Sequence, residues 1–167
     1  MKVLLINGSP HKEGNTMLAL SEMNKVFIAE GFETDIVQIG GMDIRGCICC
    51  GHCRKGNGCV FNDGVNELTA KFEQSAGLVI GAPVYYGSAN ATLMAAVQRM
   101  FYSSTFDKTM KVGAAVAAAR RGGLTAAFDE MNKFFTISGM PVASGQYWNG
   151  STAPPRVRRH RMAKGFR

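Results

Sequence analysis

The sequence predicts an α/β fold in which helices cover both faces of a five-stranded parallel sheet, a three-layer, doubly wound architecture. Short runs that are apolar throughout alternate with segments whose apolar residues recur at helical spacing, and the runs end in Gly-, Ser- or Pro-rich loops. Strands buried on both faces are apolar throughout, and parallel strands are joined by crossover helices. The length of 167 residues suits a single domain with a full hydrophobic core.

Strands and helices are expected to alternate along the chain. The expected strands cover residues 2–7, 34–39, 77–82, 111–119 and 141–147. The expected helices cover residues 15–30, 64–75, 90–102 and 124–138. In the first helix, the residues expected to face the sheet are Leu18, Met23, Val26 and Phe27. Two strand orders fit this pattern, 2-1-3-4-5 and that of half a dinucleotide-binding fold, and both place ligands beyond the carboxyl ends of the strands.

Positive charge is concentrated at the end of the chain. The net charge is +7, with 19 Lys and Arg against 12 Asp and Glu. Residues 151–167 hold six of the basic residues and no acid, so residues 1–150 are nearly neutral. We therefore expect one domain over 1–150 and a basic, irregular tail over 151–167, which is a solvated terminus or a surface for nucleic acid. No apolar run reaches the length of a membrane span, so we expect a cytoplasmic protein.

The loop after the first strand has the composition of an anion site. Its sequence, GSPHKEGNT, is rich in residues that turn backbone N–H groups toward one point, and a helix N-terminus follows it. Ser9, Asn15 and Thr16 supply side-chain donors, and His11 or Lys12 supplies charge. Alternatively, Asn15 or Thr16 serves only as the N-cap of the helix.

The spacing of this loop restricts which phosphate it binds. It matches neither the P-loop pattern nor the G-x-G-x-x-G pattern of dinucleotide-binding folds. The second strand ends in Val37-Gln38-Ile39, which lacks the acidic residue that holds a ribose in those folds. The sequence therefore favours a mononucleotide phosphate, and FMN meets that condition.

The loop after the third strand has the features of a wall for a planar ring. Pro83 stiffens the turn, Tyr85 and Tyr86 offer aromatic faces, and Gly87 allows the backbone to approach closely. Val84 adds apolar surface between them. Mostly apolar walls with a few polar backbone groups are typical of cofactor sites. In isolation, the tyrosines would be half-buried packing residues at a strand end.

The two motifs GSPHKEGNT and APVYYGSANATLMAAVQR resemble the NADPH-dependent FMN reductase family of flavodoxin-like proteins, and the resemblance covers residues 1–150. It implies a flavodoxin-like fold with the sheet order 2-1-3-4-5. It implies that Ser9, His11, Asn15 and Thr16 hold the FMN phosphate. It also implies that two further loops lie along the flavin, through Pro83, Val84, Tyr85, Tyr86 and Gly87 and through Ala119, Arg120 and Gly122. An Arg there would stabilise negative charge on the reduced ring, unless that loop is simply solvated.

All five cysteines fall in a Gly-rich loop, residues 43–60, inserted after the second strand. Cys47, Cys50, Cys53 and Cys59 are spaced C-x2-C-x2-C-x5-C, and Cys49 is additional. Closely spaced thiols on a Gly-rich loop are typical of bacterial iron–sulfur ligation, whereas structural zinc sites use separated pairs. The spacing resembles the iron–sulfur flavoprotein branch of the family, in which such a loop carries a [4Fe–4S] cluster. Free or redox-active thiols remain the alternative.

These observations predict an FMN-dependent oxidoreductase that passes electrons from NAD(P)H or a protein donor to a quinone, a flavin or a similar acceptor. No side chain is expected to be catalytic, because the chemistry belongs to the flavin. An electron-transfer iron–sulfur flavoprotein without a small-molecule substrate is the alternative, and a regulatory or nucleic-acid-binding protein using the basic tail is a further one. The resemblance implies a homodimer or homotetramer, without a membrane or nucleic-acid partner.

Overall fold

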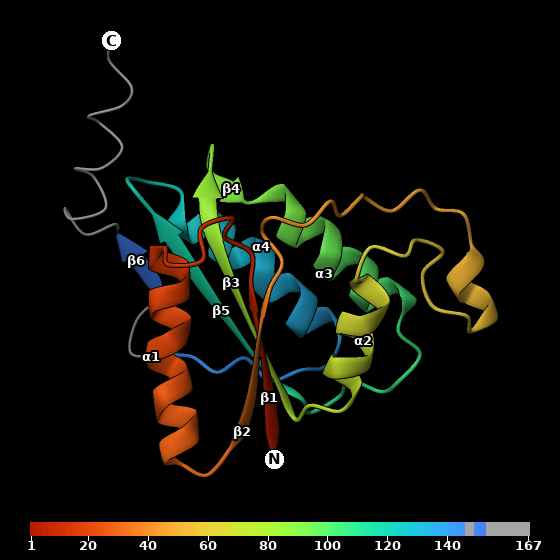
Figure 1. The fold of residues 1–167 in the computed structure, drawn as a ribbon, viewed down its shortest axis with the longest axis horizontal. Helices are drawn as coiled ribbons and strands as arrows, with labels where there is room; N and C mark the ends of the chain where they lie inside the picture. The colour runs from red at the N-terminus through yellow and green to blue at the C-terminus, as the bar shows by residue number, and fades with distance from the viewer. Residues whose placement is uncertain (146–148, 153–167) are drawn as a thin grey trace.

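The computed structural model describes residues 1–145 and 149–152 of the chain. Five strands form the parallel part of the sheet in the order β2-β1-β3-β5-β6 (Figure 1). Their bounds are Lys2–Asn7 for β1, Glu33–Gln38 for β2, Gly77–Tyr85 for β3, Val112–Ala119 for β5 and Gly150–Thr152 for β6. Counted along the chain, this is the predicted order 2-1-3-4-5. A short strand β4, Ser88–Ala89, pairs antiparallel with the end of β3 and was not predicted.

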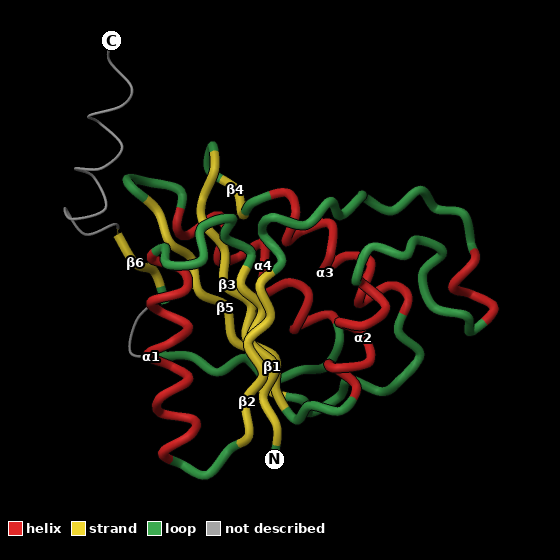
Figure 2. The backbone as a smooth tube through the Cα atoms, in the orientation of Figure 1, coloured by secondary structure: helices red, strands yellow, loops and turns green. Residues whose placement is uncertain are grey.

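Four α-helices connect the strands, within about two residues of the predicted bounds. They are α1 (Asn15–Ala29), α2 (Val65–Glu73), α3 (Ala91–Ser103) and α4 (Leu124–Ile137). A 3-10 turn, η1 (His52–Lys55), interrupts the cysteine loop. Helix α1 lies on one face of the sheet and the other three lie on the opposite face, so the predicted three layers are confirmed (Figures 1 and 2).

The last strand does not run over 141–147 as predicted. In that segment only Val142 bridges to Gly113, and residues 146–148 lie outside the described part. Strand β6 instead begins at Gly150 and pairs in parallel with Ala117–Ala119 of β5. Pro141 has no N–H to donate to a ladder, which weakens pairing there. The sheet therefore includes Ser151 and Thr152, which the sequence assigned to the tail, while the basic residues of 156–167 lie outside the described residues.

Helix α1 faces the sheet with a different set of residues from the one expected. Leu20 is fully buried, and Met23 and Phe27 pack against the same cluster as predicted. Leu18 and Val26 are more than half exposed, so their predicted inward orientation is wrong. A helix of 3.6 residues per turn cannot bring all of these residues to one narrow face, and the sheet contacts select Leu20, Met23 and Phe27.

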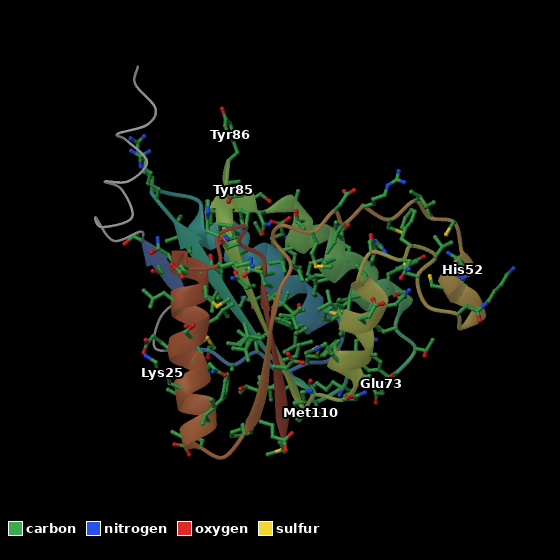
Figure 3. All side chains as sticks on the ribbon, in the orientation of Figure 1. Lys25, His52, Glu73, Tyr85, Tyr86 and Met110 are labelled. Atoms are coloured by element: carbon green, nitrogen blue, oxygen red, sulfur yellow. The ribbon has the colours of Figure 1, made fainter. Side chains whose placement is uncertain are left out.

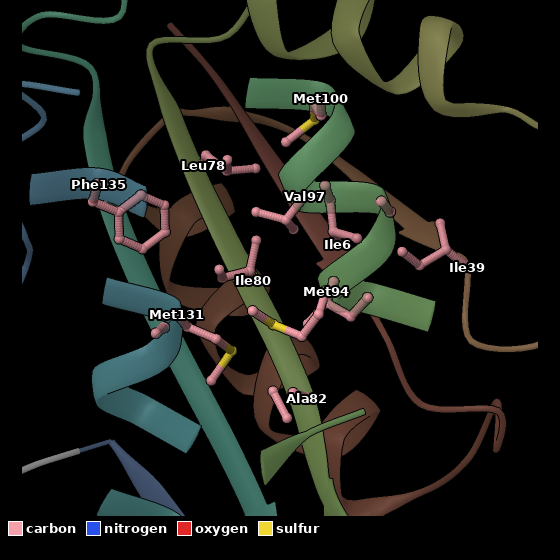
Figure 4. Close-up of a cluster of buried hydrophobic side chains, with 14 of the residues drawn as sticks. Ile6, Ile39, Leu78, Ile80, Ala82, Met94, Val97, Met100, Met131 and Phe135 are labelled. Atoms are coloured by element: carbon pink, nitrogen blue, oxygen red, sulfur yellow. The ribbon is translucent and has the colours of Figure 1, made fainter. Parts of the chain in front are cut away.

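The larger core fills the space between the sheet and helices α2, α3 and α4. Alternate strand residues point into it, among them Ile6, Ile80 and Ala82, while their neighbours Leu5 and Val79 face α1. Figure 4 shows the side chains of α3 and α4 that meet these strands. Because both faces are covered, successive residues in the middle of β1 and β3 are apolar, which is the signal that the sequence carried.

Gly113 of β5 shows how tightly this core is packed. A Cβ at this position would lie closer than 3.0 Å to ring carbons of Phe135, which is fully buried. We therefore expect Gly113→Ala to lower the free energy of unfolding by about 1–3 kcal/mol, measured by urea denaturation. In a Phe135→Leu background the smaller side chain leaves room, so the same change should cost less. An equal cost in both backgrounds would contradict this account.

Candidate functional site

A pocket of about 810 Å³ opens at the carboxyl ends of the strands, at the position that the sheet order predicts. It lies where the loop after β1 meets the ends of β3 and β5. Its lining consists of Ser9, Pro10, His11, Lys12, Glu13, Gly14, Asn15, Thr16, Pro83, Val84, Tyr85, Ala118, Ala119 and Arg120. Nine of the twelve residues predicted to bind the cofactor are therefore gathered around one cavity, within the size range of ligand sites.

The loop after β1 leaves backbone donors directed at this pocket. Helix α1 begins at Asn15 behind the N-cap residue Gly14, which has no side chain to cap the helix. The alternative, in which Asn15 or Thr16 is the N-cap, therefore does not hold. The first N–H groups of a helix have no intrahelical acceptor and carry the positive end of its dipole. Ser9 is 3% exposed, and its hydroxyl oxygen accepts the N–H of His11 at 3.1 Å, so its own proton remains available to a ligand.

Three side chains outside the pocket hold this loop in place, and no motif in the sequence indicated their role. Gln38 at the end of β2 donates to the carbonyl of Ser9 and accepts from Asn7 Nδ2 at 2.6 Å. Asn7 in turn accepts the N–H of Ser9 at 3.0 Å. Asn90, before α3, donates to the carbonyl of Gly8 at 2.7 Å. The loop is thus fixed from β1, β2 and α3 before any ligand arrives.

The predicted ring wall is only partly assembled. Tyr85 lines the pocket, but Tyr86 and Gly87 form the two-residue turn between β3 and β4, with φ values of 54° and 87°. This is the geometry of a type I′ hairpin turn, and it directs the fully exposed Tyr86 side chain away from the sheet (Figure 3). Tyr86 and Gly87 are therefore not part of the lining, nor is Gly122 in the loop after β5.

The cysteine loop forms a second, separate pocket. All five cysteines line it, together with Arg99, Tyr102 and residues between them. Cys47, Cys49 and Cys50 are exposed, and Cys53 and Cys59 are partly buried. Among the described residues, no three His, Cys, Asp or Glu side chains converge closely enough to hold one metal ion. His52 is not part of the lining and lies toward the outer end of the loop (Figure 3).

A family model that describes NADPH-dependent FMN reductase matches residues 1–154. The chain belongs to this family. Its members are flavin-dependent oxidoreductases, so the predicted family is confirmed. No helix in the described part of this FMN reductase family member is long and apolar enough to cross a membrane.

Curated relatives of this family member carry the name iron–sulfur flavoprotein. One from Methanocaldococcus jannaschii is 35% identical over 145 residues, which is 85% of this chain and 75% of that protein. Another from Methanosarcina thermophila is 33% identical over 160 residues, covering 93% of this chain and 84% of that protein. The resemblance to this branch is thus confirmed as a similarity of sequence.

Solved structures agree on the fold. RosB, in a structure with a bound 8-demethyl-8-formylriboflavin-5'-phosphate intermediate, superposes with a TM-score of 0.74 at 15% identity and covers 96% of this chain and 71% of its own. An NAD(P)H:quinone oxidoreductase from Methanothermobacter marburgensis gives a TM-score of 0.70 at 12% identity, over 92% of this chain and 85% of its own. An archaeal flavodoxin is a further match, which confirms the flavodoxin-like fold.

Proposed function

We propose that this member of the family binds FMN in the pocket at the carboxyl ends of the strands and works as an FMN-dependent oxidoreductase. The observation that carries the proposal is the N-terminus of α1, which has no side-chain cap, beside the buried hydroxyl of Ser9 in the lining of a pocket that also includes an aromatic residue, Tyr85. A phosphate fits the helix N-terminus, and a planar ring fits the wall that includes Tyr85. The proposed electron source is NAD(P)H or a protein donor, and the acceptor is a quinone, a flavin or a similar compound.

The residues of the pocket would bind and orient the cofactor. The amides at the start of α1, with Ser9 and Thr16, would hold the phosphate, and His11 and Lys12 line the same cavity. Pro83–Tyr85 would lie along the ring, while Arg120 would offset negative charge at its polar edge. Bound FMN would supply the redox chemistry, because it accepts a hydride and releases electrons singly or in pairs.

We also propose that the cysteine loop holds a [4Fe–4S] cluster through Cys47, Cys50, Cys53 and Cys59. The name of the curated relatives and the meeting of these four thiols around one pocket support this. The donor set fits the cluster chemically, since iron–sulfur clusters are held by cysteine thiolates. The thiols would have to draw together on binding, as is common where a metal site forms with its metal.

The test is purification without oxygen, followed by titration with FMN and analysis of iron and sulfide. We expect quenching of flavin fluorescence that saturates at one FMN per chain, and bleaching of the visible flavin absorption by NADPH or NADH. A protein that binds no flavin after FMN is added would refute the first proposal. Iron and sulfide well below four atoms per chain, after reconstitution, would refute the second.

An electron carrier without a small-molecule substrate is the second candidate, because the relatives are named only for their cofactors. It would bind FMN and iron yet react slowly with NAD(P)H. Assembly into a homodimer or homotetramer and a cytoplasmic location stay predictions. Sedimentation of the protein with its cofactors bound measures the oligomeric state. The side chain of Tyr86 beside the pocket is fully exposed and offers apolar surface for a contact between subunits.

A further inference from the structure

We propose that Arg99 of α3 is a positioning residue for the cysteine loop, which fixes Cys59 as a preformed ligand and raises the reduction potential of the cluster through an N–H bond to its sulfur. This inference rests on the proposed cluster. Beyond the presence of the cluster, it assigns a role to a buried arginine outside the loop and says in which direction this arginine shifts the reduction potential.

Arg99 is 1% exposed and donates four hydrogen bonds to this loop and to Asp63 just after it. Its two terminal nitrogens bind the carboxylate of Asp63 at 2.5 and 2.8 Å, and Nη1 also donates to the carbonyl of Arg45 at 2.9 Å. Its guanidinium carbon lies 4.9 Å from the centre of the Phe61 ring. A single side chain on a core helix thereby joins both ends of the loop, which a lysine with its single ammonium group could not do.

A further donor of Arg99, Nε, points at the sulfur of Cys59 at 3.2 Å. The backbone of Cys59 is held as well, because its N–H donates to Asn66 Oδ1 at 2.8 Å and its carbonyl accepts from Asn66 Nδ2 at 2.9 Å. Cys59 is therefore fixed from α2 through its backbone and from α3 through its sulfur. Cys53 is partly buried like Cys59, but among the described residues only the sulfur of Cys59 accepts a hydrogen bond from a side chain, so Cys59 is the thiol that is positioned before metal arrives.

The bond to sulfur has a predictable electrostatic effect. Reduction of an iron–sulfur cluster adds negative charge that spreads onto its sulfur ligands, and hydrogen bonds to those sulfurs favour the reduced state. The guanidinium of Arg99 holds the pKa of Asp63 below its usual range through their hydrogen bonds, so the carboxylate is charged at neutral pH. The sulfur of Cys59 thus accepts an N–H from an arginine whose charge is balanced by Asp63. Removing the charge of Arg99 makes the surroundings of the sulfur more negative, whereas removing the charge of Asp63 makes them more positive.

The experiment compares reconstituted wild-type protein with Arg99→Gln and Asp63→Asn by redox titration of the cluster. We expect Arg99→Gln to lower the equilibrium constant for reduction about tenfold, which is about 59 mV for a one-electron couple. Asp63→Asn leaves the arginine uncompensated and should move the potential in the opposite direction. Both Arg99→Lys, which keeps the charge, and Arg99→Gln should lower the iron content, because neither side chain can bind Asp63, Arg45 and Cys59 together. A shift in the same direction for Arg99→Gln and Asp63→Asn, or no shift, would overturn the electrostatic role.

Arg54→Gln is the matched control, since it removes the same charge from a residue within the cysteine loop itself. Arg54 is exposed and donates to the hydroxyl of Tyr102 at 3.3 Å, not to a cysteine. We expect the cluster of the Arg54→Gln variant to keep the wild-type reduction potential, because an exposed charge is screened by solvent. FMN affinity and far-ultraviolet circular dichroism should match wild type in every variant that is compared, which separates an effect on the loop from loss of the fold.

A measurement on metal-free protein separates failure of this inference from failure of the proposed cluster. Hydrogen exchange of residues 58–63 should become at least about tenfold faster in Arg99→Gln, since the change removes hydrogen bonds that a charged group donates to this segment. The same segment should be unchanged in Arg54→Gln. Unaltered exchange in Arg99→Gln would refute the positioning role, even if wild-type protein binds a cluster. Faster exchange in a protein that takes up no iron would support the positioning role while the cluster proposal falls.

Discussion

Replacing Gly40 with alanine is expected to weaken FMN binding at least about tenfold. A Cβ on Gly40, just after β2, would overlap the backbone of Gly8 and Ser9, so the loop after β1 would have to move. Moving it breaks the alignment of Ser9 and its neighbours with the phosphate. A hydrogen bond to a charged group contributes about 1.5–3 kcal/mol, and 1.4 kcal/mol is a factor of ten in affinity. Titration of apoprotein with FMN, followed by flavin fluorescence, measures the change.

Two control variants separate the loop from stability and from glycine chemistry. Gly41→Ala adds the same methyl group one residue later, where a Cβ would meet nothing within 4 Å, and should bind FMN as wild type does. Gly113→Ala crowds the core against Phe135 instead, so it should lower stability without weakening FMN binding. If Gly40→Ala binds FMN normally, the phosphate is not held by the loop after β1, and the proposed binding mode is wrong.

The parallel sheet could be predicted because its signal is local to each strand. Leu4 and Ile6 face α2, α3 and α4, while Val3 and Leu5 face α1, so β1 is apolar at each of its four central positions. The prediction of the final strand was wrong because only three residues, Gly150–Thr152, pair with β5. Such short pairing leaves no periodicity in the sequence, and the apolar residues before it attracted the prediction.

The pocket could be predicted as a set of loops, but its supports could not. Gln38 carries no motif, and its bond to Ser9 exists because β1 and β2 pair in a register that sets Asn7 beside Gln38. Arg99 has the same limitation, because an arginine on an amphipathic helix is ordinarily exposed. Only the return of the cysteine loop over α3 buries it. Tyr86 was assigned to the wall of the ring site because aromatic residues at strand ends often line cofactor sites. The type of the turn at Tyr86 and Gly87 decides where the Tyr86 side chain points, and the sequence pattern did not reveal that turn.

The cysteines offer the other large effect, because two adjacent thiols have opposite expected roles. Cys50 fits the C-x2-C-x2-C spacing, so Cys50→Ser should leave three ligands and lose the cluster on reconstitution. Cys49 adopts a left-handed backbone with φ 54°, and its N–H donates to the sulfur of Cys47 at 3.4 Å. Glycine accepts that conformation without strain, so Cys49→Gly removes one thiol and relieves about 1 kcal/mol.

We therefore expect Cys49→Gly to retain the full iron and sulfide content of wild type, whereas Cys50→Ser falls to background in the same analysis. FMN should still bind to both variants, because its pocket lies at the carboxyl ends of the strands and shares no lining residue with the cysteine pocket. The reverse pattern, with iron lost only in Cys49→Gly, would assign the second ligand to Cys49. Iron retained in both variants would mean that neither thiol holds the cluster, because a four-thiolate site cannot lose a ligand without consequence.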